Sequence, residues 1–138
     1  MNDEVLKEIL TEVKSIALIG ASKNPERPSY RVMKFLISQG YDLYPVNPGL
    51  AGKKLLGRKV YASLSDIPLP IDMVDIFRKS EAVGPIVDEA IKTGAKIIWM
   101  QLGVINEPAA KTAQQAGLKV IMNHCPAIEI PRLGLLRG

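Results

Sequence analysis

The sequence predicts an α/β fold, a Rossmann-like, doubly wound parallel sheet of about five strands, with residues 1–138 as a single domain. Short apolar runs that suit buried strands alternate along the chain with amphipathic segments of helical length. Helices of that length return the chain to the same edge of a sheet, so the strands are expected to be parallel. The length of 138 residues is that of one ordinary domain.

An opening helix, a first strand and a first crossover helix are predicted near the N-terminus. Residues 2–13 place apolar side chains at helical spacing, with acidic residues in the first turn, where the helix dipole favours them. Residues 15–20 form a short apolar run that ends in glycine, as in a strand buried on both faces. Pro28 then suits the first turn of a helix and Gly40 suits its end.

The second strand is expected at residues 41–46. Pro45 has no amide hydrogen, so it is expected at the end of that strand. A turn at residues 47–49 follows, and then a stretch rich in lysine and glycine, in which residues 59–61 are predicted to form a small extra strand.

The second half of the chain supplies three more strands, predicted at residues 71–77, 95–101 and 119–122. Ser80 is expected to cap a helix over residues 80–92, and Asn106 is expected to cap a helix that runs to residue 116. The tail, residues 123–138, is expected to be irregular.

Two strand orders satisfy the rule that crossovers are right-handed. The expected order is the Rossmann order 3-2-1-4-5, and the flavodoxin-like order 2-1-3-4-5 is the alternative. In both orders, ligands bind at the carboxyl ends of the strands, near the point where the strand order reverses. The segments expected at that edge are residues 20–23, 46–48, 77–79, 100–103 and 123–126.

The composition excludes several classes of protein. With 47% hydrophobic and 23% charged residues, the chain is not expected to be disordered. No apolar run approaches the ~20 residues of a membrane-spanning helix, and the acidic N-terminus is unlike a secretory signal, so a cytoplasmic protein without a membrane partner is expected. Cys125 is the only cysteine and His124 the only histidine, which excludes an internal disulfide and argues against a metal site.

Positive charge is concentrated in one part of the chain. The net charge is +4, but residues 23–59 hold eight basic side chains against two acidic ones, a net +6, so the rest sums to −2. Such a patch suits an anionic partner, either a phosphorylated small molecule or nucleic acid, and equally suits a solvated surface. Aromatic residues are only 5% of the chain, so surfaces on which bases stack are poorly supplied and no nucleic-acid partner is expected.

The loop after the first strand differs from a dinucleotide-binding loop. The fingerprint G-x-G-x-x-G is replaced by Gly-Ala-Ser-Lys-Asn-Pro at residues 20–25. The second strand ends in Val46, Asn47 and Pro48, with no carboxylate to hold a ribose diol. Both features together disfavour NAD.

A phosphate site nevertheless remains in this loop. It has a glycine, a serine hydroxyl, Lys23, backbone amides and a helix N-terminus behind them. Arg27, Tyr30 and Arg31 either add contacts to a phosphate or lie on a solvated surface, and the residues alone leave both alternatives open.

Five segments resemble the stand-alone coenzyme A-binding proteins, which are similar in turn to the N-terminal domain of the succinyl-CoA synthetase α subunit. These segments are residues 16–23, 44–48, 75–78, 99–103 and 123–126. They occur in register over roughly residues 12–133, which makes the resemblance far more specific than any one motif.

The resemblance implies coenzyme A as the ligand, and it implies which residues meet each part of it. From the diphosphate through the adenosine to the pantetheine arm and its thiol, the implied contacts are Gly20, Ala21, Ser22, Lys23, Tyr30, Arg31, Val46, Asn47, Pro48, Phe77, Arg78, Lys79, Val83, Met100, Gln101, Leu102, Gly103 and Cys125. The 3′-phosphate of coenzyme A suits a basic segment and a second strand without a carboxylate.

No catalytic constellation is recognisable, so a coenzyme A or acyl-CoA binding module for storage, delivery or sensing is the leading hypothesis, with its protein partner unknown. Related synthetases use a phosphorylated histidine on a further domain, and His124 is instead expected to be an exposed or hydrogen-bonded loop residue. Asp75 is expected to be a structural or ligand-orienting carboxylate, and Cys125 either an inert packing residue or a thiol near the end of the pantetheine arm. The alternatives are an NAD(P)-dependent enzyme and a redox-sensing, nucleotide-binding regulator.

Overall fold

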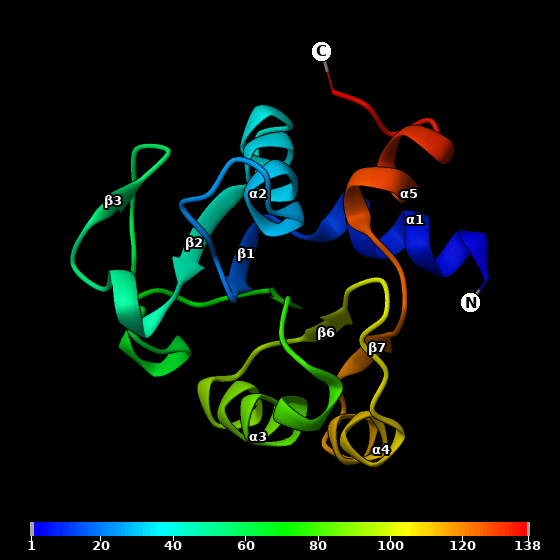
Figure 1. Cartoon of the computed structure of the whole chain (residues 1–138). Helices are drawn as coiled ribbons and strands as arrows, with labels where there is room; N and C mark the ends of the chain where they lie inside the picture. Colours follow the sequence, from blue (N-terminus) through cyan, green and yellow to red (C-terminus); the bar gives the residue numbers. More distant parts are fainter. Residues whose placement is uncertain (1, 138) are drawn as a thin grey trace.

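Five parallel strands form the central sheet in the computed structural model, which describes residues 2–137 (Figure 1). The strands are β1 (Ser15–Ile19), β2 (Asp42–Val46), β5 (Met73–Ile76), β6 (Ile97–Met100) and β7 (Lys119–Ile121). Their order in space is β2-β1-β5-β6-β7, and every neighbouring pair is parallel. The predicted α/β class and the five-stranded parallel sheet are confirmed.

The strand order corresponds to 2-1-3-4-5, so the expected Rossmann order is wrong and the flavodoxin-like alternative is right. After β2 the chain does not form a crossover helix that would place a third strand beside it. Instead, Tyr61 pairs with the outer edge of β2 through an isolated bridge to Val46. The Tyr61 amide donates to the Pro45 carbonyl (3.0 Å) and the Tyr61 carbonyl accepts from the Asn47 amide (2.9 Å). This short pairing occupies the outer edge of β2, and β5 pairs with the free side of β1.

The segment between β2 and β5 consists of short elements. They are the 3-10 helix η1 (Pro48–Leu50), the antiparallel hairpin of β3 (Lys54–Leu55) and β4 (Arg58–Lys59), and the 3-10 helix η2 (Leu64–Asp66). The small strand predicted at residues 59–61 is thus divided between the hairpin and the Tyr61 bridge.

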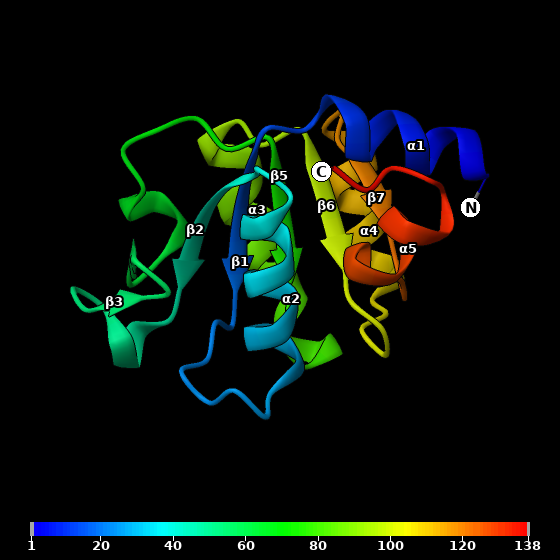
Figure 2. The same cartoon turned by 90° about the horizontal axis from the view of Figure 1, so that it is seen from above.

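Helices cover both faces of the sheet (Figures 1 and 2). One face carries α1 (Asp3–Glu12), α2 (Pro28–Ser38) and α5 (Pro126–Arg132), and the other carries α3 (Val83–Thr93) and α4 (Glu107–Gln115). Alternate strand residues point to the two layers, which bury separate clusters of apolar side chains. Within β1, for example, Ile16 and Leu18 pack beneath the first group of helices, whereas Ala17 and Ile19 pack against the second.

Proline placement accounts for two corrections. Pro45 lies inside β2 rather than at its end, which is tolerated because β2 is an edge strand and the nitrogen of Pro45 faces away from β1. The tail is not irregular, because it contains α5. Pro126 occupies the first position of α5, where a helix needs no amide donor, and Pro131 lies in its last turn.

Helix caps follow the sequence in one case and depart from it in another. The Asn106 side chain accepts from the Ala109 amide (3.0 Å) at the start of α4, as predicted. Ser80 does not cap α3, because it begins a separate 3-10 turn, η3 (Ser80–Ala82). Its hydroxyl oxygen instead accepts from the Ile105 amide (3.0 Å), which joins the loops that follow β5 and β6.

Asp72 fixes the amino-terminal edge of the sheet, opposite the expected ligand edge. Its carboxylate accepts from the Lys14 and Ser15 amides (2.9 and 3.2 Å), and the Asp72 amide donates to the Ser15 hydroxyl oxygen (2.9 Å). Burial acts to raise the pKa of Asp72, but the hydrogen bonds from Lys14 and Ser15, together with nearby Lys96, hold it below its usual value.

We expect Asp72→Asn to destabilise the protein by about 1 kcal/mol at pH 7, the typical contribution of such hydrogen bonds. The folded pKa lies below the unfolded value, so the carboxylate stabilises the fold above the unfolded pKa, and this contribution is lost as the pH falls. Urea unfolding should therefore show a difference between the variant and the wild type that shrinks from pH 7 toward pH 3. A difference that grows on acidification would contradict this role of Asp72.

Candidate ligand-binding site

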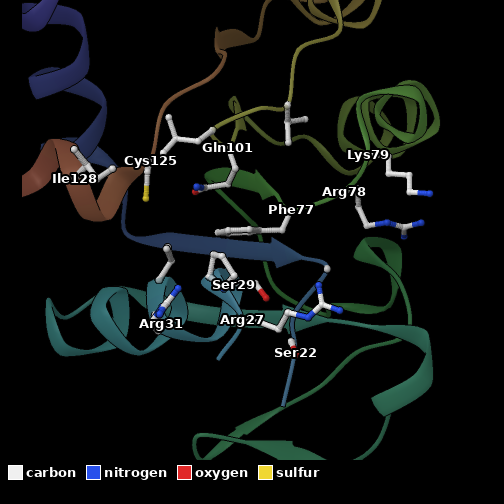
Figure 3. Close-up of a pocket in the computed structure, with 15 residues that line it drawn as sticks. Ser22, Arg27, Ser29, Arg31, Phe77, Arg78, Lys79, Gln101, Cys125 and Ile128 are labelled. Carbon is white, nitrogen blue, oxygen red and sulfur yellow. The ribbon is translucent and has the colours of Figure 1, made fainter. Parts of the chain in front are cut away.

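Three adjoining pockets lie along the carboxyl edge of the sheet. The largest has a volume of about 740 Å³ and lies between the loop after β1, the start of α2, the ends of β5 and β6, and α5 (Figure 3). A second, of about 350 Å³, lies at the end of β2, and a third, of about 330 Å³, lies between the loops that follow β1 and β2. Gly20 and Arg78 border the first two pockets, and Ser22 and Arg27 border the first and third.

Gly20 sets the position of the loop after β1. It has a φ of +90°, and a Cβ added there would lie 2.2 Å from the carbonyl oxygen of Phe77. The amides of Gly20 and Ala21 donate to the Val46 carbonyl (3.0 and 3.2 Å), and the Phe77 amide donates to the Ile19 carbonyl (2.8 Å). The loop is therefore fitted between the ends of β2 and β5, and only glycine permits this approach.

Asn47 joins the loop after β1 to the turn after β2. Its side-chain nitrogen donates to the Ala21 carbonyl (2.7 Å), and its side-chain oxygen accepts from the Gly49 amide (2.8 Å). A carboxylate at this position would have no hydrogen to donate to Ala21. The end of β2 is therefore neutral, and its side chain serves to hold the loop.

The N-terminus of α2 faces the largest pocket. Arg27 precedes the helix without a side-chain capping bond, and the first turn has no acidic residue. Ser29 lines the pocket although only 6% of its surface is exposed, and its hydroxyl has no hydrogen-bond partner among the described residues. A helix start without a capping acid favours an anion.

Four cationic side chains line the largest pocket, namely Arg27, Arg31, Arg78 and Lys79. None of them forms an ion pair with a residue in the part of the chain that the structure describes. Lys23 lines the third pocket, next to Ser22 and Arg27. The site is thus electropositive where the loops after β1, β2 and β5 converge.

The two ends of the largest pocket differ in their balance of charged and apolar side chains. Figure 3 shows Arg27, Arg78 and Lys79 at one end, whereas Cys125 and Ile128 lie at the other end together with one cation, Arg31. Ile128 and Leu102, both lining residues, are 52% and 56% exposed and form an open rim. The pocket therefore suits an elongated ligand with an anionic head and an uncharged tail.

A buried carboxyl group lies next to Gln101, one of the residues that line this pocket. Asp75 of β5 is fully buried, and burial raises its pKa well above the usual value. With its amide nitrogen turned toward Asp75, Gln101 donates to both carboxyl oxygens (3.0 and 3.3 Å). Gln101 also lines the pocket, so Asp75 is placed to orient a side chain that a ligand would meet.

Hydrogen bonds hold the segment after β7 against β6. The His124 amide donates to the Met100 carbonyl (3.3 Å), and the Trp99 indole donates to the His124 carbonyl (2.9 Å). The His124 ring Nδ1 lies 2.7 Å from the Met122 carbonyl, so the prediction of a hydrogen-bonded loop residue is confirmed. These contacts place Cys125 at the pocket wall.

The structure brings together most residues that the sequence assigned to the site. Those that line one of the three pockets are Gly20, Ser22, Lys23, Arg31, Val46, Asn47, Pro48, Phe77, Arg78, Lys79, Gln101, Leu102 and Cys125. Five others line none of the three: Ala21, Tyr30, Val83, Met100 and Gly103. Val83 and Met100 are fully buried against the opposite helix layer, whereas Gly103 is exposed.

The assigned set omitted several residues of the largest pocket, namely Arg27, Pro28, Ser29, Val32, Val104 and Ile128. The helix start predicted at Pro28 was a usable signal for Ser29, which lies in the first turn. Ile128 carried no such signal, because it belongs to α5 in the segment expected to be irregular.

Residues 2–137 hold neither a metal-binding cluster nor a membrane-spanning helix. They contain no group of three or more His, Cys, Asp or Glu side chains arranged to hold a metal ion. None of their helices has the length and apolar character needed to cross a membrane.

Comparison with known proteins identifies relatives along most of the chain. The sequence model of the CoA binding domain family matches residues 14–131. The uncharacterised protein YneT of Bacillus subtilis is 40% identical over 120 residues, 87% of each chain. The α subunit of ADP-forming acetate–CoA ligase I from Pyrococcus furiosus is 37% identical over 115 residues, which are 78% of this chain but 25% of that subunit.

A solved structure has the same fold over nearly its whole length. It is a hypothetical protein from Pyrococcus horikoshii, 47% identical in sequence, with a TM-score of 0.92 over 96% of this chain and 92% of that one.

We expect Gly20→Ala to destabilise the protein by about 2 kcal/mol or more, because it adds a clash with Phe77 to the cost of a positive φ. Gly52→Ala is the matched control, since Gly52 has a φ of +83° but open space around its Cα. The control should cost only about 1 kcal/mol in urea unfolding. Equal costs for the two variants would show that the approach to Phe77 is unimportant.

We expect Asp75→Asn to become more stable than the wild type as the pH rises. The folded pKa of Asp75 lies above the unfolded value, so its contribution is present at low pH and is lost as the pH rises from about 3.8 through the folded pKa. Thermal unfolding between pH 4 and pH 8 should show a widening advantage of the variant, opposite in sign to that of Asp72→Asn. A constant difference would contradict a neutral, buried Asp75.

Proposed function

Since the chain belongs to the family of coenzyme A-binding domains, we propose that the pockets at its carboxyl edge bind coenzyme A or an acyl-CoA. We further propose that it acts as a binding module for storage, delivery or sensing, without a catalytic constellation of its own. The chain spans 25% of the acetate–CoA ligase subunit that it matches, and the ligase reaction is not assigned to it.

The distribution of charge in the largest pocket is the observation that carries this proposal. Coenzyme A has a diphosphate, a 3′-phosphate and a long uncharged pantetheine arm. The head of such a ligand suits the end with Arg27, Arg78 and Lys79, which lack carboxylate partners. The arm suits the end lined by Cys125 and Ile128.

The neutral end of β2 favours coenzyme A over NAD. An NAD site uses an acidic side chain here to bind the ribose diol. In this chain the position is Asn47, whose amide is already bonded to Ala21 and Gly49. The neighbouring third pocket, lined by Lys23 and Arg27, has the charge that a ribose phosphate requires.

We propose which residues contact each part of coenzyme A. The diphosphate would contact Gly20, Ser22 and the start of α2. The adenosine would contact Val46, Asn47 and Pro48. Phe77, Arg78 and Lys79 would flank the nucleotide and the start of the arm, Gln101 and Leu102 would lie along the arm, and Arg31 would add charge from α2. Five residues outside the pockets would support this arrangement, namely Ala21, Tyr30, Val83, Met100 and Gly103.

We expect coenzyme A to raise the melting temperature far more than NAD or ATP does. A ligand that binds only the native state stabilises it by about 2.7 kcal/mol at a hundredfold excess over Kd. Thermal shift measurements with the three ligands at equal concentration test the assignment. Stabilisation by NAD and not by coenzyme A would overturn it.

We expect Arg31→Ala to weaken coenzyme A binding about tenfold or more, because a charge-assisted hydrogen bond contributes ~1.5–3 kcal/mol. Lys34→Ala is the control, since it removes the same charge from an exposed position of α2 outside the pockets. Calorimetric titrations at low and moderate salt, repeated with dephospho-coenzyme A, show which phosphate Arg31 meets. Equal losses in both variants would reduce the role of Arg31 to general surface charge.

A further inference from the structure

We propose that Cys125 is a thiol modification site, at which bound coenzyme A forms a mixed disulfide through its own sulfur. The inference rests on the proposed function, because it needs the ligand to lie with its diphosphate at the loop after β1. It goes further in assigning a covalent, reversible step to one residue.

The position of the thiol is the first observation. Cys125 is only 7% exposed, and the surface it retains borders the largest pocket. Figure 3 shows its sulfur projecting from the start of α5 toward the pocket, on the side away from Arg78 and Lys79. Any reagent that reaches this sulfur must therefore enter the pocket or its rim.

Two buried polar side chains in the same pocket are the second, independent observation. Gln101 is 5% exposed, and its side chain has no hydrogen-bond partner other than Asp75 among the described residues. Ser29 is 6% exposed, and its hydroxyl has no partner among them. Every fully buried side-chain nitrogen or oxygen of the described residues has a partner, so these two groups reach the open space of the pocket, where a ligand can bond to them. The amides of a pantetheine arm supply both the N–H that Gln101 needs and carbonyls that a hydroxyl can meet.

The distance along the sheet edge matches the length of the arm. The loop after β1 and the segment after β7 are separated by three strand spacings, about 14 Å at ~4.8 Å each. A pantetheine arm has about as many chain bonds as four extended residues, which span at most ~14 Å. A coenzyme A anchored at Gly20 and Ser22 therefore delivers its sulfur to the neighbourhood of Cys125.

The rim of the pocket accommodates a disulfide reagent. Leu102 and Ile128, which line the pocket, are more than half exposed. When one half of coenzyme A disulfide occupies the pocket, the other half can thus extend into solvent. The rim is open at the end where the thiol lies.

The step is thiol–disulfide exchange and needs no further oxidant. The Cys125 sulfur loses its proton to solvent and attacks one sulfur of coenzyme A disulfide. The bond between Cys125 and that sulfur forms as the disulfide of the reagent breaks. The second coenzyme A leaves as a thiolate that carries the electron pair of the broken bond. A free thiol reverses the reaction by the same route.

Anchoring by the pocket predicts selectivity as well as reaction. A bound reagent reacts as if at high local concentration, so coenzyme A disulfide should modify Cys125 at least about tenfold faster than glutathione disulfide does. Desulfo-coenzyme A, which binds through the same groups but has no sulfur, should suppress the reaction.

The test is intact-mass spectrometry of the full chain after incubation with each disulfide at equal concentration, without reductant. The expected result is one coenzyme A adduct per chain, which dithiothreitol removes and excess desulfo-coenzyme A prevents. The matched control is the double variant Cys125→Ser/Thr11→Cys, which moves the thiol to an exposed position of α1. It should react with both disulfides at similar rates, without protection by desulfo-coenzyme A.

Calorimetric titration of the wild type with desulfo-coenzyme A separates this inference from the proposed function. Binding without adduct formation overturns the role of Cys125 and leaves the proposed function intact. An adduct that forms equally fast from both disulfides also overturns it, because Cys125 is then only an accessible thiol. Absence of binding overturns both proposals.

Discussion

The close approach of Gly20 to the carbonyl oxygen of Phe77 is the contact on which the site depends. β1 lies between β2 and β5, at the point where the strand order reverses, so its loop must leave the sheet between two strand ends. The glycine lets that loop hydrogen-bond to Val46 on one side while it touches Phe77 on the other. Asn47 then fixes the loop from the side of β2. As a result, cationic residues from the loops after β1 and β5 and from α2 line one pocket.

A set of side-chain hydrogen bonds connects the remaining loops of the carboxyl edge. Asn106 donates to the Ser80 carbonyl (2.8 Å), and Asn123 accepts from the Gly103 amide (2.8 Å). With the Ser80–Ile105 and Trp99–His124 bonds, they join the loops after β5, β6 and β7. The far wall of the pocket is therefore held in place before a ligand binds, which lowers the entropic cost of binding. The buried carboxyl group of Asp75 adds to this support by holding Gln101, which lines the pocket.

Sequence patterns predicted the features that local physics determines. Buried strands, the first position of α2 and the Asn106 cap each follow from a few neighbouring residues. The strand order does not follow from neighbouring residues, because it depends on how the segment after β2 folds. The Tyr61 bridge in that segment has no local sequence signal. Ser80 was assigned a cap but bonds to Ile105, a partner distant in sequence. α5 lies in residues 123–138, which were expected to be irregular, and the omission of Ile128 from the site followed from that error.

The central claim is that one ligand spans the carboxyl edge from the loop after β1 to the segment after β7. A crystal structure of the protein grown with coenzyme A tests it most directly. The account predicts the diphosphate at Ser22 and the start of α2, the pantetheine arm past Gln101, and the sulfur next to Cys125. Coenzyme A bound away from the loop after β1, or with its arm directed out of the largest pocket, would contradict the account.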